Sequence, residues 1–197
     1  TPDYSSAASD VYKRQLLPTG NAVDEIDGVR TTCIDNGMPV VLVEASALGK
    51  SGYESPDELE SDDELKKRIE SIRLRAGELM NLGDVQDKTV PKISLIAAPQ
   101  DGGSISTRTF IPHRVHQSIG VLGAASVAAA CRIPGSVAGA VGEVGDDSVL
   151  EVEHPSGRFA VDIDVAEIDG SYSVRRSALL RTARKLMDGN VYVNAGE

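Results

Sequence analysis

Tryptophan is absent from this 197-residue chain, and aromatic residues make up only 4% of it. The core must therefore be aliphatic, and the 41% hydrophobic content is enough for one domain or two small ones. Only two cysteines occur, Cys33 and Cys131, and neither has the spacing of a CxxC or metal-ligand motif. Both lie in apolar runs, which predicts buried free thiols and favours a reducing cytoplasm.

The signatures of several function classes are also missing. No GxGxxG, P-loop or HExxH motif occurs, so we expect neither a nucleotide cofactor nor a metal. No signal peptide or transmembrane run is visible, so we expect no membrane partner. The 30 acidic and 20 basic residues give a net charge of −10, which argues against a nucleic-acid partner. An anionic ligand would need local positive contacts, which the stretch 108–116 can supply.

The stretch 111–131 changes character halfway along. Its first half is polar and basic and its second half is small and apolar, which predicts a loop and then a helix that begins near Ser118. A helix that is apolar on every face is buried on all sides. Pro134-Gly135 would end this helix, while Gly120 and Gly123 near its start predict a close approach to its backbone.

The start of this helix is a candidate anion site. Free N–H groups and the partial positive charge of a helix start suit a carboxylate or phosphate, and His113, Arg114 and His116 would add to them. An ordinary core helix with a polar lead-in is the alternative, and the residues alone leave the two interpretations balanced. Arg108 lies on a predicted strand just upstream, where it either faces solvent or contacts a ligand.

The remaining pattern predicts strands and one amphipathic helix. Apolar or alternating segments predict strands at 29–34, 38–43, 93–97, 105–111, 149–153, 158–165, 173–180 and 191–193. Asp35-Asn36-Gly37 predicts a hairpin turn between the first two strands, and Asn36 could be a turn residue only. Segment 139–148 is predicted to be a loop.

The amphipathic helix has a clear start signal. Ser61-Asp-Asp-Glu64 matches a capping box, and the helix would end near Gly83. Its apolar stripe consists of Leu65, Ile69, Ile72, Ala76 and Leu79. We expect its cations to face solvent; these are Lys66, Lys67, Arg68, Arg73 and Arg75. Together the elements predict an α+β fold, with a curled mixed sheet wrapped round the central buried helix and one amphipathic helix on the surface.

Six segments carry a family resemblance. They are LLPTGN (16–21), TCIDNGMPVV (32–41), GYE (52–54), MNLGDV (80–85), FIPHRVHQSIGV (110–121) and VEHPSG (152–157). They resemble the 4-oxalomesaconate tautomerases, in the wider PrpF family that includes the 2-methylaconitate cis–trans isomerases. The resemblance implies a diaminopimelate-epimerase-like fold, in which two similar halves face each other across a cleft. Residues 16–197 would be the C-terminal half and residues 1–15 a tail or junction outside the family.

The resemblance also implies a chemistry. The family moves a proton on an unsaturated tricarboxylate without cofactor or metal, and the tautomerases act in gallate or protocatechuate degradation. The acid–base lysine and cysteine lie in RGGTSK and NCGN motifs of the N-terminal half, and neither motif occurs in this sequence. The catalytic residues are therefore unassigned here, with His116 as a possible auxiliary. The expected partners are the missing N-terminal half, the tricarboxylate and, as the family suggests, a second copy in a homodimer.

This half would supply substrate binding. The resemblance assigns that role to two glycine-containing turns and the loop before the helix, namely Thr19, Gly20, Asn36, Met38, His113, Arg114, His116, Ser118, Ile119 and Gly120. His116 would donate to a carboxylate or shuttle a proton, and we favour the donor role. Val115 departs from a cysteine expected in relatives, while His154 is expected to be structural. A 2-methylaconitate isomerase and an inactive, binding-only half are the alternatives.

Overall fold

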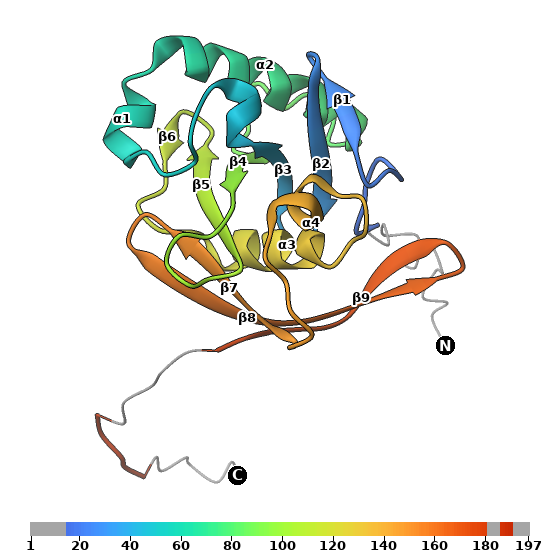
Figure 1. Ribbon diagram of the computed structural model, residues 1–197, viewed down its shortest axis with the longest axis vertical. Coiled ribbons are helices and arrows are strands. Elements are labelled where there is room, and N and C mark those ends of the chain that lie inside the picture. The colour runs from blue at the N-terminus through green and yellow to red at the C-terminus, as the bar shows by residue number, and fades with distance from the viewer. Residues whose placement is uncertain (1–14, 181–185, 191–197) are drawn as a thin grey trace, which may run out of the picture.

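The computed structural model describes residues 15–180 and 186–190 (Figure 1). One mixed sheet has the order β1-β2-β3-β4-β5-β7-β8-β9, and the short β6 pairs with β5. The strands are β1 Asp24–Ile26, β2 Val29–Asp35, β3 Pro39–Glu44, β4 Lys92–Ala97, β5 Ile105–Ile111, β6 Arg114–Val115, β7 Val149–His154, β8 Gly157–Ile168 and β9 Ser171–Leu179. The predicted α+β class is confirmed. The predicted tail 1–15 (apart from Gln15) and the predicted strand 191–193 lie outside the described residues.

The predicted hairpin at Asp35-Asn36-Gly37 is confirmed. Strands β2 and β3 pair antiparallel from Asp35 opposite Pro39, so the turn consists of residues 36–38. Parallel pairing joins β3 to β4 and β5 to β7, whereas the other neighbours are antiparallel. The parallel β5–β7 contact brings the end of β7 beside the first residues of β5, and this contact matters for the site below.

Helices lie on both faces of the first five strands. The helical segments are η2 Ala45–Leu48, α1 Pro56–Glu60, α2 Asp63–Leu79, α3 Val121–Cys131 and α4 Val137–Val141. Helix α2 covers one face through an aliphatic core that includes Ile69 and Leu95. Helix α3 packs on the other face and also contacts β7, β8 and β9, so that α3 and α4 lie between the upper strands and the long β8–β9 hairpin (Figure 1).

Helix α3 is buried as predicted, but it begins later than predicted. Residues Gly123 to Cys131 are all buried. The helix starts at Val121 rather than near Ser118, because Ser118 donates its N–H to His116 Nδ1 at 3.0 Å and Gly120 is extended (φ −67°, ψ 141°). The predicted close approach does not occur at Gly120, where a Cβ would meet no described atom within 4 Å, and at Gly123 a Cβ would lie 3.8 Å from Ile119 Cγ1, which is an ordinary contact.

The predicted capping box at Ser61–Glu64 is wrong. The motif Ser-x-x-Glu occurs three times between residues 51 and 64, and the box forms at the second copy, where Ser55 and Glu58 cap α1 reciprocally. Ser61 instead donates its hydroxyl hydrogen to the carbonyl oxygen of Glu58 at 2.8 Å and closes α1. Helix α2 is capped by Asp62, whose carboxylate accepts from the N–H of Leu65 at 2.9 Å.

Most of the predicted apolar stripe of α2 is buried. Two residues of the helix differ from the prediction, one in the stripe and one among the cations. Leu79, at the end of the helix, is 47% exposed, and α2 ends there rather than near Gly83. Arg73 was expected to face solvent and is fully buried. The predicted loop 139–148 also differs, because α4 occupies its first three residues.

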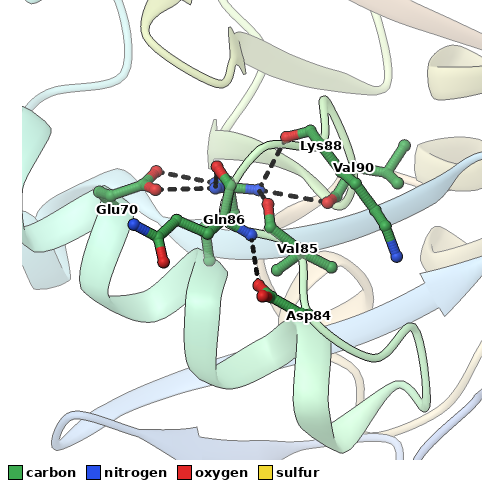
Figure 2. Close-up of polar contacts among 7 residues, drawn as sticks. Glu70, Asp84, Val85, Gln86, Lys88 and Val90 are labelled. Carbon is green, nitrogen blue, oxygen red and sulfur yellow. Dashed lines mark hydrogen bonds and ion pairs between the residues drawn. The ribbon is translucent and has the colours of Figure 1, made fainter.

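Arg73 is buried because neighbouring oxygen atoms satisfy its guanidinium group (Figure 2). Two of its nitrogens donate to the Glu70 carboxylate at 2.7 Å each. Its Nη1 donates to the carbonyl oxygens of Val85, Lys88 and Val90 at 2.9, 3.1 and 3.2 Å. The Arg73 side chain therefore fastens the loop after α2 to the helix. Each nitrogen of its buried guanidinium group has an acceptor, as buried polar groups require.

Three simpler predictions can be compared with the structure. Cys33 and Cys131 are free and buried, as predicted, and burial raises the pKa of each thiol to about 12. Within residues 15–180 and 186–190, no helix is long and apolar enough to cross a membrane. The same residues contain no group of three potential metal-binding side chains.

Candidate functional site

The β5–β6 hairpin carries the first basic residues of the candidate site. Phe110 pairs with Val115 and Ile111 with Arg114, which leaves Pro112 and His113 at the turn. His113 and Arg114 are exposed. Val115 is buried in the core between the sheet and α2, and its N–H donates to Glu60 Oε1 at 2.8 Å. Position 115 is therefore a packing position, and valine fills it with an apolar side chain.

His116 presents one defined donor. Its backbone N–H donates to the Thr109 carbonyl at 2.8 Å, and its ring Nδ1 accepts from the N–H of Ser118. A backbone N–H can only donate, so Nδ1 is unprotonated and the neutral ring carries its hydrogen on Nε2. This geometry suits the donor role that we favoured for His116.

Ser118 connects His116 to a histidine that sequence reasoning left outside the site. The Ser118 hydroxyl oxygen lies 3.3 Å from His154 Nε2. His154 ends β7, and the parallel pairing of β7 with β5 brings it to the loop that follows β5 and β6. Its place in the VEHPSG segment was the only signal, because strand pairing cannot be read from a single sequence.

The start of α3 is open. Gly120 is the N-cap, and no described side chain caps the helix there. The first N–H groups of a helix have no partner within the helix and carry its partial positive charge. Because the space beside Gly120 is empty of described atoms, a ligand can reach these groups. Ile119 is 5% exposed and anchors the loop in the core.

The turn between β2 and β3 reaches the middle of the same helix. The N–H of Asn36 donates to Ser126 Oγ at 3.1 Å, and that hydroxyl donates to the Met38 carbonyl at 2.8 Å. The Asn36 side-chain amide donates to the Ala125 carbonyl at 3.1 Å and to Ser177 Oγ at 3.3 Å. Asn36 and Met38 therefore lie against α3, and these contacts fasten the turn to the helix.

Thr19 and Gly20 belong to a separate part of the molecule. The Thr19 hydroxyl donates to Asp24 Oδ2 at 2.7 Å, and the Gly20 N–H donates to the Leu17 carbonyl at 2.9 Å. Gly20 and Asn36 line a cavity of about 370 Å³ between residues 15–22 and the β8–β9 turn. The structure thus brings His116 and Ser118 together at the start of α3. Gly20 and Asn36 instead lie together at the cavity beside the β8–β9 turn.

Arg108 does not face solvent, being only 9% exposed. Its Nε donates to the Glu54 carbonyl at 2.6 Å, and its Nη1 donates to the Thr107 carbonyl at 2.9 Å. Both acceptors are neutral carbonyl groups, while the charges of Glu54 and Glu153 also act on the guanidinium group. Burial lowers the pKa of His154, and the charge of Arg108 contributes to the same shift.

Comparison with known proteins places the chain in a family. The PrpF protein family matches residues 3–194. The chain is 56% identical over 180 residues to a (4E)-oxalomesaconate Delta-isomerase of Novosphingobium sp. strain KA1, a match that covers 90% of this chain and 50% of the relative. It is 53% identical over 180 residues to the 4-oxalomesaconate tautomerase of Pseudomonas putida KT2440, covering 90% and 49%.

A solved structure agrees with this relationship. The crystal structure of a methylitaconate-delta-isomerase superposes with a TM-score of 0.76 at 25% identity, and the match covers 88% of this chain and 50% of that one. The chain thus spans about half the length of the relatives it matches. Since the family match covers nearly the whole sequence, the chain belongs to the PrpF family.

Proposed function

We propose that this chain forms the substrate-binding half of a cofactor-independent isomerase that tautomerises 4-oxalomesaconate in gallate or protocatechuate degradation. The observation that carries the proposal is the open start of α3, flanked by His116 and Ser118. The two relatives whose names contain oxalomesaconate are 53% and 56% identical, against 25% for the methylitaconate isomerase. A 2-methyl-aconitate isomerase of Shewanella oneidensis is only 28% identical over 200 residues, and this difference favours 4-oxalomesaconate over the alternative substrate, 2-methylaconitate.

The geometry supports a division of labour within the reaction. The Nε2–H of His116, the Ser118 hydroxyl and the first N–H groups of α3 would hold one carboxylate, with His113 and Arg114 able to contact another. Loss of a proton next to a carbonyl group builds negative charge on oxygen, and donors fixed in advance stabilise that charge. His116 donates in this scheme. The proton itself would be moved by residues of the opposite half.

We further propose that the sheet, curled around α3, is one half of a diaminopimelate-epimerase-like pair and that the other half closes over the helix start. The contacts of α3 with β2 and β3 on one side and with β7, β8 and β9 on the other support this arrangement. The free cysteines support a reducing cytoplasm as the compartment. A second copy of the whole protein could complete a homodimer.

A titration tests the binding role. Amide spectra of the chain would be recorded with 4-oxalomesaconate, trans-aconitate and 2-methylaconitate. We expect saturable shifts centred on residues 116–123 and stronger binding of 4-oxalomesaconate than of 2-methylaconitate. Shifts confined to the cavity beside Gly20, or none with any tricarboxylate, would refute the proposal. Tighter binding of 2-methylaconitate would select the alternative isomerase.

A second measurement tests the division of labour. The isolated chain is incubated with 4-oxalomesaconate in deuterated buffer, and incorporation of deuterium into the substrate is followed. We expect binding without exchange, as for a binding-only half. Exchange catalysed by the isolated chain would show that its own residues move the proton.

A further inference from the structure

His116 and His154 are held in the same way. Each ring Nδ1 accepts from the backbone N–H two residues ahead, at 3.0 Å from Ser118 and at 3.3 Å from Ser156. Because a backbone N–H has a hydrogen to give and no lone pair to offer, neither Nδ1 can carry a hydrogen while these contacts exist. Both rings are therefore in the neutral tautomer that has its hydrogen on Nε2, and at His154 the Ser156 hydroxyl, also 3.3 Å from Nδ1, is then a donor to the same nitrogen.

The tautomer of His154 decides what Ser118 can do. His154 Nε2 lies 3.3 Å from the Ser118 hydroxyl oxygen. With the hydrogen on Nε2, His154 is the donor in this contact and Ser118 is the acceptor. The hydroxyl hydrogen of Ser118 must then point to another acceptor, and Ser118 lies two residues before the open N-cap at Gly120.

We propose that His154 is a positioning residue, which orients the Ser118 hydroxyl so that it donates to a carboxylate bound at the start of α3. The inference rests on the proposed function for the identity of the ligand. His154 would not touch the carboxylate itself, and its whole effect on the affinity for the carboxylate would come from orienting Ser118. Ser118 and His116 then offer two hydrogens, one O–H and one N–H, to the same carboxylate.

The surroundings of His154 keep it in the state that this role needs. Burial lowers the pKa of His154, the positive charge of Arg108 lowers it further, as does that of His116 whenever that ring is protonated, and a hydrogen bond to the backbone of Arg158 raises it. At neutral pH the ring is therefore neutral. A protonated ring would turn an N–H at Nδ1 toward the N–H of Ser156, placing two donors against each other.

A double-mutant cycle separates this role from simple packing. The dissociation constant of trans-aconitate is measured by amide titration for the unaltered chain and for His154→Gln, His154→Asn, Ser118→Ala and the double variant His154→Asn/Ser118→Ala. The longer Gln side chain places an amide N–H near the position of Nε2, whereas Asn does not reach it. Unchanged amide spectra elsewhere verify that each variant is folded.

We expect His154→Asn and Ser118→Ala each to weaken binding about fivefold, the effect of losing one hydrogen bond. His154→Gln should restore affinity to within about twofold, and the double variant should match Ser118→Ala. A fivefold effect of His154→Asn that persists without the Ser118 hydroxyl would overturn the inference. So would equal loss in the Gln and Asn variants.

The imidazole nitrogen spectrum gives an independent reading that needs no ligand. Long-range proton–nitrogen correlations at about pH 7.5 should show His154 with a bare Nδ1 and a protonated Nε2. A hydrogen on Nδ1 would contradict the inference even if trans-aconitate binds. Failure of the unaltered chain to bind trans-aconitate, with the expected tautomer present, would instead overturn the proposed function and with it the assignment of Ser118 to a ligand.

Discussion

The hydroxyl of Ser126, in the middle of α3, donates to the carbonyl oxygen of Met38 at 2.8 Å, although the two residues are 88 positions apart. The hydroxyl oxygen of Ser126 also accepts from the N–H of Asn36 at 3.1 Å. Ser126 is fully buried, so both contacts are shielded from water. One small side chain thereby ties the β2–β3 turn to the helix whose start forms the candidate site.

Replacing Ser126 by alanine tests this tie. Ser126→Ala should lower the free energy of unfolding by about 1–3 kcal/mol, because two backbone groups near the helix lose their partner. Urea unfolding measures the loss, and hydrogen exchange at the Asn36 amide should accelerate. Ser171→Ala, at an exposed position in the β8–β9 turn, is the control and should change stability by less than about 0.5 kcal/mol. Equal effects of the two substitutions would contradict the tie.

Arg73 offers a test of the buried guanidinium group. Arg73→Met keeps much of the side-chain volume but leaves the Glu70 carboxylate and four carbonyl oxygens without their donor, so we expect a loss of about 3 kcal/mol. Chemical denaturation measures it. Arg75→Met removes an arginine of the same helix that is 66% exposed and paired with Asp27, and should cost less than about 1 kcal/mol. If the Arg75 variant were the less stable of the two, the hydrogen bonds of Arg73 would not stabilise the fold.

A substitution at Gly120 can block the proposed ligand site without disturbing the fold. A Cβ there meets no described atom within 4 Å, and φ is −67°, so Gly120→Ala should fold with a loss of less than about 1 kcal/mol. The methyl group would occupy the space that a carboxylate needs beside the helix start. We expect trans-aconitate to bind about tenfold more weakly, measured by amide titration. Gly145→Ala, also in open space, is the matched control, and unaltered affinity in the Gly120 variant would move the ligand elsewhere.

The protein should become less stable as the pH is lowered through the range in which His154 takes up a proton. Burial, His116 and Arg108 lower the pKa of His154 below its ordinary value of 6.5. Between the two values the unfolded chain binds a proton that the folded chain does not, so stability decreases as pH falls through this window. Unfolding curves at about pH 7.5 and pH 5.5 measure the decrease. The decrease should be smaller in His154→Gln, and an equal decrease would assign it to other groups.

Much of the fold follows from local patterns. Segments 29–34 and 105–111 are rich in Val, Ile and Thr, which favour strands, and each formed within one residue of its predicted bounds. The burial of α3 was equally visible, since small apolar residues cover every face of residues 123–131. The exact residues that cap the helices were harder to predict. The Ser-x-x-Glu copies that begin at Ser55 and Ser61 are six residues apart and fit the same rule, and only the hydrogen bonds of the structure show which copy forms the box.

The features that sequence reasoning missed depend on distant partners. Arg73 follows Ile72 on the helix, and its burial depends on carbonyl groups 12 to 17 residues away that no pattern reveals. His154 reaches Ser118 only because β7 lies parallel to β5. The basic loop before α3 was recognised from its composition, whereas the atom that each histidine offers could be read only from the structure.

The small residues of α3 have a consequence for how this site can change during evolution. Little more than methyl groups separate the helix backbone from the strands around it, so a larger side chain within 123–131 would push the whole helix aside rather than adjust one contact. Every donor at its start would then move together. New substrate preferences are therefore expected to arise in the hairpin and turn residues around the helix start, while the helix itself keeps its sequence.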